Sequence, residues 1–241
     1  MNMNEVKRGK VRCGHIVYFR AVTEESKKHP VIENFVNINV TSGNNGKWRY
    51  LSPMLLGPFN VIEPLAKFPA QNLYTEDGVH PGFVKISDTH QRAMCTNIEN
   101  YWQFSKIMNI DIDTNHLIKS SFFERRAKGF NDVKPHRRAI PKAKGHAIAA
   151  YFNSGVYNYL DSRFFYCDMY EKIVLMHPLY KELEKMLGDG ISLHIIGYDG
   201  RDIPINKDSL NKEYRNPDFP FGHELVLCCL LSKIYPWKQN K

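Results

Sequence analysis

Segment 99–106 reads ENYWQFSK and places Glu99, Gln103 and Lys106 at positions i, i+4 and i+7. On a helix this spacing puts an acid, an amide and an amine on one face, while Tyr101 and Phe104 share another. A helix that buries its aromatic face can therefore present three different polar groups to one ligand. The same spacing is that of a solvent-exposed polar stripe, the commonest surface of an amphipathic helix.

A basic segment follows this run. Residues 124–144 carry eight Lys or Arg and two acids, so six of the eight surplus positive charges of the chain lie here. The eight are Arg125, Arg126, Lys128, Lys134, Arg137, Arg138, Lys142 and Lys144. The adjacent Arg137 and Arg138 can offer forked donors to a phosphate. We predict phosphate binding by Arg137, Arg138, Lys142 and Lys144; the alternative is a solvated loop with ordinary surface charges.

Composition and motifs exclude several classes of protein. The 241 residues are 43% hydrophobic, 12% aromatic and 24% charged, which is typical of a folded protein and not of a disordered or fibrous one. No apolar run approaches the roughly 20 residues of a membrane span, and no secretory signal follows the basic start, so we expect a cytoplasmic protein. Dehydrogenases, P-loop enzymes and serine hydrolases are disfavoured because their Gly-rich loops and nucleophile elbow are missing.

The cysteines predict neither crosslinks nor a metal site. Their number is odd and they form no C-x-x-C pair, which favours reduced thiols over a disulfide framework or structural zinc. They are Cys13, Cys95, Cys167, Cys228 and Cys229. His177 and His194 have no second ligand at metal spacing, so we expect no metal and no cofactor.

The first third of the chain predicts strands and loops. Residues 15–22, 31–41 and 47–51 are rich in β-branched and aromatic residues, which favours strands. Residues 51–83 contain five prolines and three glycines, which predicts a long shaped loop of the kind that is often functional.

The remainder predicts helices and one late strand. Helices are expected at 97–108 with Asn97 as N-cap, at 117–128 ended by Gly129, and at 156–176, 178–188 and 222–235; a buried strand is expected at 192–198. Strands early and helices late predict an α+β fold, and we see one domain over residues 1–241.

The 99–106 run, an E-x-x-x-Q-x-x-K pattern with interleaved aromatics, resembles the signature helix of the NADAR superfamily, or YbiA-like proteins. Further segments resemble that family in the same order: Leu51-Ser52-Pro53, the helix at 176–187, the strand ending near Asp199, and residues 222–225. The resemblance implies a NADAR-like core at residues 50–235 behind a strand-rich extension of residues 1–49. The 51–58 segment with Gly222-His223 is similar to a branch that phages often encode.

Proteins of the family that this chain resembles are N-glycosidases, which act on ribose-linked bases or on ADP-ribose attached to guanine. The resemblance implies a metal-independent N-glycosidase that removes ADP-ribose from guanine in DNA, or cleaves a related N-ribosyl metabolite, with Glu99 and Lys106 catalytic. Cleavage develops positive charge at the anomeric carbon, which a carboxylate can stabilise while it takes a proton from water. Alternatively, a neutral Lys106 can attack that carbon and form an imine with the opened sugar.

Other residues would bind the substrate. Gln103 can hold a ribose hydroxyl, and Asp199 or Asp202 can do the same, as acids often do for ribose diols. Trp102 or Trp48 can stack on a base, although core packing is the alternative for each.

The helix start at Gly222 and His223 offers backbone N–H groups to a phosphate. Two other functions stay open. One is a non-catalytic module that binds nucleic acid or ADP-ribose through the basic segment, and the other is a base-modifying glycosyltransferase. The enzyme hypothesis requires that the ends of Glu99, Gln103 and Lys106 meet in a common cleft instead of bulk solvent.

Overall fold

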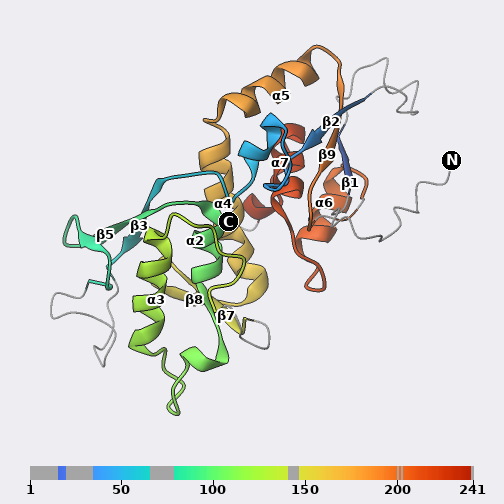
Figure 1. Cartoon of the computed structure of the whole chain (residues 1–241). Coiled ribbons are helices and arrows are strands. Elements are labelled where there is room, and N and C mark those ends of the chain that lie inside the picture. Colours follow the sequence, from blue (N-terminus) through green and yellow to red (C-terminus); the bar gives the residue numbers. More distant parts are fainter. Residues whose placement is uncertain are drawn as a thin grey trace. The chain divides into compact units, whose positions relative to one another are not determined.

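The computed structural model describes residues 16–19, 35–65, 79–140, 147–199, 201 and 203–239 of the chain. Within these ranges the protein is a mixture of helices and three small sheets, which confirms the predicted α+β class. The chain divides into two compact units, a central unit of residues 53–174 and a terminal unit of residues 1–52 and 175–241 (Figure 1). The predicted extension of residues 1–49 and core of residues 50–235 stay predictions.

The central unit holds the predicted catalytic residues. Its strands are β3 (Phe59–Pro64), β4 (Val84–Lys85), β5 (His90–Cys95), β6 (Lys106–Ile107), β7 (Ala149–Phe152) and β8 (Gly155–Tyr157). Its helices are α2 (Ile98–Phe104), the 3-10 turn η2 (Asn109–Asp111), α3 (Ser120–Asn131) and α4 (Tyr159–Val174). The strands form two antiparallel sheets of order β3-β5-β4 and β6-β7-β8.

Strands β3 and β5 run side by side (Figure 1) and turn every second residue inward. Val61 pairs with Ala93 and Glu63 pairs with Gln91, and all four are buried. The inward face of this sheet therefore carries an acid and an amide among apolar groups, and both need polar partners inside the unit.

Aromatic side chains fill the core between the helices and the sheets of the central unit. Tyr101 of α2 lies 5.1 Å from Phe152 of β7 between ring centroids, and Phe152 stacks on Phe165 of α4 at 4.7 Å. Phe104 of α2 and Phe130 of α3 belong to the same cluster. This packing buries the apolar face of α2 and turns its polar face away from the core.

The terminal unit combines one small sheet with its own helices. Its sheet has the order β1-β9-β2, with β9 antiparallel to β1 and parallel to β2. The elements are β1 (Ile16–Phe19), β2 (Phe35–Asn39), η1 (Lys47–Leu51), α5 (Pro178–Gly188), β9 (Ser192–Ile196), α6 (Lys207–Tyr214), α7 (His223–Ser232) and η3 (Pro236–Lys238). Even the buried, apolar α7 is too short to span a bilayer, and no described helix has the length and apolarity that crossing requires.

Several predicted elements are confirmed, and two early ones are wrong. Strands β1, β2 and β9 and helices α5 and α7 lie within the segments predicted for them. Residues 47–51 form the 3-10 turn η1 and no strand. The predicted loop at 51–83 contains β3, whose buried and exposed residues alternate in register with those of β5. Residues 66–78 of that loop lie outside the described part.

Three helix boundaries also differ from the predictions. The helix expected at 97–108 ends at Phe104, and Gly129 lies inside α3 instead of ending it. A Cβ at Gly129 would lie 2.2 Å from ring carbons of Phe104, so glycine is needed there for the close approach of two helices. Residues 155–157 form strand β8 ahead of α4, because Asn153 and Ser154 adopt left-handed conformations (φ 45° and 60°) that close a hairpin.

Candidate active site

The start of α2 is fixed by its cap. Asn97 accepts the backbone N–H of Asn100 on its side-chain oxygen at 2.8 Å, as the sequence predicts. The backbone amide of Glu99 donates to the carbonyl oxygen of Pro53 at 3.0 Å. These bonds satisfy donors that the first helical turn leaves open and fix the position of Glu99, whose carboxylate is favoured by the helix dipole.

The end of α2 places Lys106 differently from the prediction. Ser105 donates its hydroxyl to the carbonyl oxygen of Tyr101 at 2.7 Å, and its own carbonyl oxygen accepts the backbone N–H of Tyr151 at 2.8 Å. The chain then leaves the helix, and Lys106 pairs with Ala150 as the first residue of β6. The prediction that Lys106 shares a helical face with Glu99 is therefore wrong, because the bond to Tyr151 directs the chain into the sheet.

The three polar side chains nevertheless meet, and we call Glu99, Gln103 and Lys106 the polar row. Gln103 Nε2 donates to Glu99 Oε1 at 2.8 Å, and Lys106 Nζ donates to Gln103 Oε1 at 3.0 Å. All three side chains are half-buried. The amide of Gln103 thus bridges an acid and an amine and fixes the orientation of both.

Trp102 lies beside the row and belongs to the packing of the central unit. Its ring stacks on Phe152 with a centroid distance of 6.1 Å and contacts Tyr166 at 5.2 Å. Lys106 Nζ lies 4.9 Å from the centroid of the Trp102 ring, a geometry that favours a protonated amine. These contacts agree with the core-packing alternative for Trp102, and base stacking stays a prediction.

A small hollow adjoins Trp102 and Lys106. Its volume is about 10 Å³, which is room for about one water molecule. It is lined by Trp102, Lys106, Ala147, Ala149, Ala150, Tyr159 and Ser162. A ribose is larger than this hollow, so a sugar must lie over the exposed side of the row or displace the surrounding side chains.

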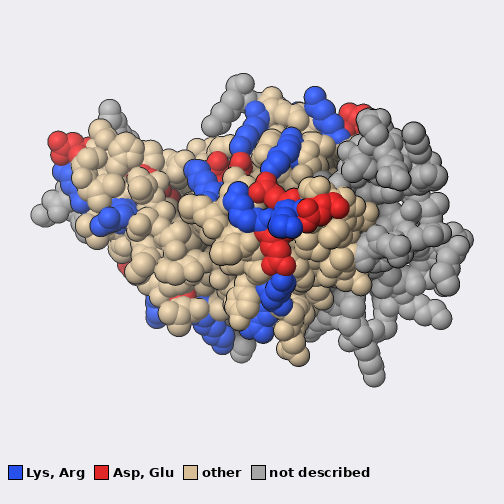
Figure 2. All heavy atoms as spheres, turned by 90° about the horizontal axis from the view of Figure 1, so that it is seen from above, with Lys and Arg blue, Asp and Glu red and all other residues tan. Residues whose placement is uncertain are grey.

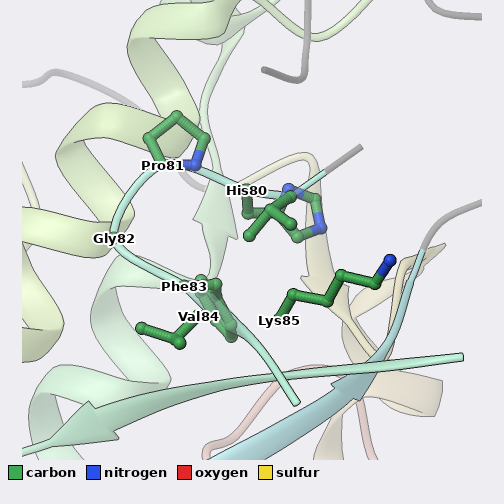
Figure 3. Close-up of a pocket in the computed structure, with 7 residues that line it drawn as sticks. His80, Pro81, Gly82, Phe83, Val84 and Lys85 are labelled. Atoms are coloured by element: carbon green, nitrogen blue, oxygen red, sulfur yellow. The ribbon is translucent and has the colours of Figure 1, made fainter. Parts of the chain in front are cut away.

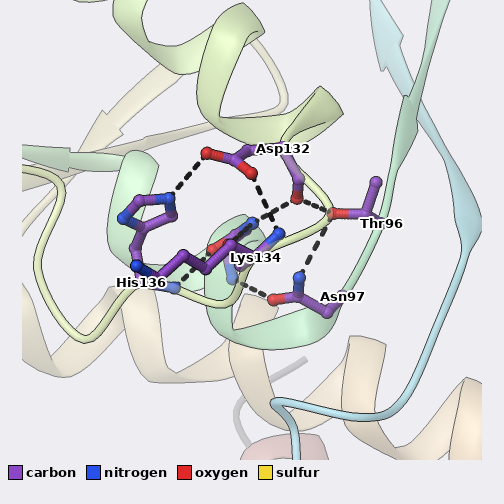
Figure 4. A network of polar contacts seen from close by, with 6 residues as sticks. Thr96, Asn97, Asp132, Lys134 and His136 are labelled. Atoms are coloured by element: carbon purple, nitrogen blue, oxygen red, sulfur yellow. Dashed lines mark hydrogen bonds and ion pairs between the residues drawn. The ribbon is translucent and has the colours of Figure 1, made fainter.

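Within the basic segment, the loop that follows α3 is bonded to α2 (Figure 4). Asn100 is fully buried, and its Nδ2 donates to the carbonyl oxygens of Asp132 at 2.8 Å and Lys134 at 3.0 Å. Its Oδ1 accepts the backbone N–H of His136 at 2.8 Å. Thr96 donates its hydroxyl to the same carbonyl oxygen of Asp132. The loop at 132–136 is therefore fixed to the helix that carries Glu99.

Charge interactions support the same loop. Asp132 accepts the backbone N–H of Lys134 at 2.9 Å and lies 2.7 Å from Nε2 of His136. These two hydrogen bonds hold the pKa of the Asp132 carboxyl below its usual value. Arg137 and Arg138 follow directly and are exposed, so both are available to a ligand in solvent.

Two arginines of the basic segment form ion pairs within the protein. Arg125 forms a bidentate pair with Asp111, with both N···O distances at 2.7 Å. Arg126 is buried in an ion pair with Glu63. The positive charge that the segment can offer to a ligand is therefore smaller than its sequence predicts. Figure 2 shows basic and acidic side chains interspersed on the face in view, as is usual for a protein surface.

The structure places Asp199, Gly222 and His223 in the terminal unit. The backbone N–H of Asp199 donates to Oε1 of Glu224 at 2.7 Å. Gly222 is the N-cap of α7, and the buried His223 bonds through Nε2 to the carbonyl oxygen of Val40 at 3.1 Å. These contacts are internal to the terminal unit, and substrate roles for the three residues stay predictions.

Lys142, Lys144 and Asp202 lie outside the described residues. Within the described ranges, no three or more His, Cys, Asp or Glu side chains are grouped in a way that could hold a metal ion.

The sequence analysis missed a buried network in the central unit. Arg126 donates to both carboxylate oxygens of Glu63, and Gln91 accepts the backbone N–H of His80 at 3.0 Å. His80 Nε2 lies 3.0 Å from the hydroxyl oxygen of Tyr151. We call these five residues the buried network; each is at most 1% exposed. Burial, together with the charge of Arg126, lowers the pKa of His80 to about 3.

One sequence signal points to this network. Arg126 stands four residues from both Phe122 and Phe130, in the middle of the apolar stripe of α3. A cation on an apolar stripe implies a buried partner. The sequence does not identify Glu63 as that partner, because it lies 63 positions away.

A larger hollow, of about 460 Å³, is lined by residues 79–85. Figure 3 shows His80, Phe83 and Lys85 among its lining side chains. Because His80 is 1% exposed and neutral at physiological pH, it contributes an aromatic wall here rather than a charge.

Comparison of the chain with protein-family models, with curated proteins and with solved structures finds no match.

Proposed function

We propose that the protein is a metal-independent N-glycosidase that cleaves a ribose–nitrogen bond at the polar row. The observation that carries the proposal is the half-buried, hydrogen-bonded series Glu99–Gln103–Lys106, which runs from the first turn of α2 to the first residue of β6. The alternative, a polar stripe exposed to solvent, gives no reason for one amide to bridge an acid and an amine. The resemblance of residues 99–106 to the NADAR signature helix supports the same reaction.

Glu99 acts on the water in this proposal. As the bond between the anomeric carbon and the base nitrogen breaks, its electron pair leaves with the base and positive charge grows on the sugar. The Glu99 carboxylate stabilises that charge and accepts the proton of the attacking water, and this proton then passes to the nitrogen of the departing base. Its partly exposed position allows a sugar to approach from solvent.

Lys106 acts as a cation rather than as a nucleophile. Its amine donates to Gln103 and lies over the face of the Trp102 ring, which attracts a cation. A protonated amine has no lone pair for attack. Borohydride reduction during turnover should therefore leave the protein mass unchanged. A mass increase at Lys106 equal to a reduced sugar adduct would replace this route by the imine route.

The substrate class is a base that carries ADP-ribose, with ADP-ribosylated guanine in DNA as the first candidate and an N-ribosyl metabolite as the second. Arg137 and Arg138 are exposed and directly follow the loop at 132–136, which is bonded to α2. They can therefore offer forked donors to the two phosphates of ADP-ribose. With such a substrate we expect the protein to act in the cytoplasm. If a phage encodes it, this is the cytoplasm of the infected host.

Release of ADP-ribose from an ADP-ribosylated oligonucleotide, followed by mass spectrometry, tests the proposal. Glu99→Gln keeps the shape of the side chain and removes the charge, so turnover should fall by roughly 10²–10⁴-fold, the usual contribution of a general base. Glu124→Gln is the matched control, since Glu124 is exposed on α3. A folded Glu99→Gln protein that turns over like the parent refutes the proposal.

A non-catalytic nucleic-acid-binding module is the second candidate, and the exposed Arg137–Arg138 pair favours it. It predicts tight binding of unmodified DNA or RNA that weakens steeply with salt, no released sugar, and loss of binding when both arginines become alanine. A glycosyltransferase would differ from both by yielding a base of increased mass in the same assay.

A further inference from the structure

Asn100 stands next to Glu99 in sequence, but its side chain is buried inside the protein. It is 0% exposed and uses both of its N–H groups and its oxygen, in hydrogen bonds of 2.8, 3.0 and 2.8 Å. All three partners are backbone groups of the loop at 132–136. A buried amide with complete hydrogen bonding is rigid and costly to disturb.

The pattern of partners requires a carboxamide at this position. The loop presents two carbonyl oxygens, from Asp132 and Lys134, and one N–H, from His136, toward one point of α2. A carboxylate would repel the two carbonyl oxygens, and a hydroxyl has too few donors. On the outer side of the loop, the Asp132–His136 pair at 2.7 Å closes the same turn.

We infer that Asn100 is a positioning residue that holds Arg137 and Arg138 at a fixed distance from Glu99 in the reaction. The inference rests on the proposed function and deepens it, because it assigns phosphate recognition of the substrate to a loop whose place is set by the catalytic helix itself. Asn100 touches neither sugar nor phosphate and acts through the backbone that leads into the arginine pair.

A double-mutant cycle in the intact protein tests this inference. Asn100→Ala and the Arg137→Ala/Arg138→Ala variant are assayed alone and together on ADP-ribosylated oligonucleotide, with Asn131→Ala on α3 as the matched control. We expect Asn100→Ala to raise KM about tenfold, equivalent to about 1.4 kcal/mol, and to leave kcat within about threefold. Adding the arginine changes to Asn100→Ala should then raise KM by less than about twofold, because the arginines are already displaced.

Full additivity in the cycle, or an equal loss of kcat and kcat/KM in Asn100→Ala, overturns the inference while leaving the N-glycosidase proposal intact. A parent protein that releases no sugar overturns the proposed function, and the inference with it. If Asn100→Ala does not fold, His136→Ala loosens the same loop from its half-exposed side and should raise KM in the same direction, by about threefold. A KM unchanged in His136→Ala would then count against the positioning role.

Discussion

Two of the acid–cation systems in the central unit differ in how they are held. In the buried network, Glu63 and Arg126 are each about 1% exposed and bond directly to one another. In the polar row, Glu99 and Lys106 are half-buried and are joined through the amide of Gln103. The first system holds its charges against one another within the core, whereas the second keeps part of each charged group within reach of solvent.

This difference separates a structural role from a catalytic one. A buried ion pair offsets a large desolvation cost only while both partners are present, so neither can be used for chemistry without loss of stability. An acid held by a neutral amide can accept a proton or a developing positive charge and keep its place. The row is therefore better suited to chemistry, although the buried network contains more titratable groups.

The largest expected effect is the removal of one partner of the buried pair. Glu63→Ala leaves the Arg126 guanidinium buried without its counter-charge and should lower the free energy of unfolding by roughly 3–5 kcal/mol, as measured by urea denaturation. Glu99→Ala in the half-buried row should lower it by less than about 1 kcal/mol. Combining Glu63→Leu with Arg126→Met replaces both charges by apolar side chains and should restore most of the loss. Equal losses in the two single variants would erase the distinction between the systems.

The next effect is the response of the buried network to acid. His80 has a pKa of about 3 in the folded protein and about 6.5 when unfolded, so the unfolded chain binds the extra proton first. The stability that neutral His80 provides is complete above pH 6.5 and is lost as the pH falls toward 3, with a slope of up to about 1.4 kcal/mol per pH unit. His80→Gln keeps a hydrogen-bonding group near Tyr151 but does not titrate. Its stability should approach that of the parent as the pH falls; parallel pH profiles would contradict this.

A smaller effect tests whether the packing of α2 against α3 holds the polar row in place. Gly129→Ala puts a methyl group about 2.2 Å from the Phe104 ring, which forces α2 and α3 apart and should cost roughly 1–3 kcal/mol of stability. Because Gln103 precedes Phe104, turnover should fall as well. Lys128→Ala, one residue earlier and exposed, is the control and should change neither. A Gly129→Ala protein that is more stable than the parent would show that helix propensity outweighs the close contact.

Local signals in the sequence predicted several features of the fold correctly. Asn97 caps α2 because a side-chain oxygen beside open N–H groups is favourable in any context. Pro178 opens α5 and Gly188 is its last residue, as their backbone preferences require. The buried strand β9 follows from its run of apolar residues. Each of these features depends only on residues within a few positions.

Features that depend on distant contacts were not predicted. The sequence predicts that Gly129 ends a helix, but the close approach of Phe104 from α2 makes it an interior residue of α3. The spacing predicts Lys106 on the helix, whereas the hydrogen bond from Tyr151 N–H to the carbonyl oxygen of Ser105 directs the chain into a strand. The spacing of Glu99, Gln103 and Lys106 did predict their meeting, because Lys106 has a side chain long enough to reach back across the helix end.

The buried polar residues Glu63 and Asn100 also have partners that are distant in the sequence and were not predicted. Glu63 lies in a proline-rich segment that reads as a loop, and its partner is 63 residues away. Asn100 reads as one more polar residue of α2, although its partners at 132–136 make it fully buried. A sequence pattern can show that a polar group faces inward, but only the tertiary fold provides the partner that makes this stable.

The smallest effect concerns the link within the row itself. Gln103→Ala removes two hydrogen bonds between half-buried groups, which together should cost about 1 kcal/mol, or about fivefold in kcat/KM, with little change in stability. Gln103→Met is the control for shape, and it should lose about as much because it too lacks the bridging groups. A loss of several hundredfold in both would assign Gln103 to the chemical step itself. An undiminished rate would show that Glu99 and Lys106 work independently, and the amide that distinguishes the row from the buried pair would then have no part in catalysis.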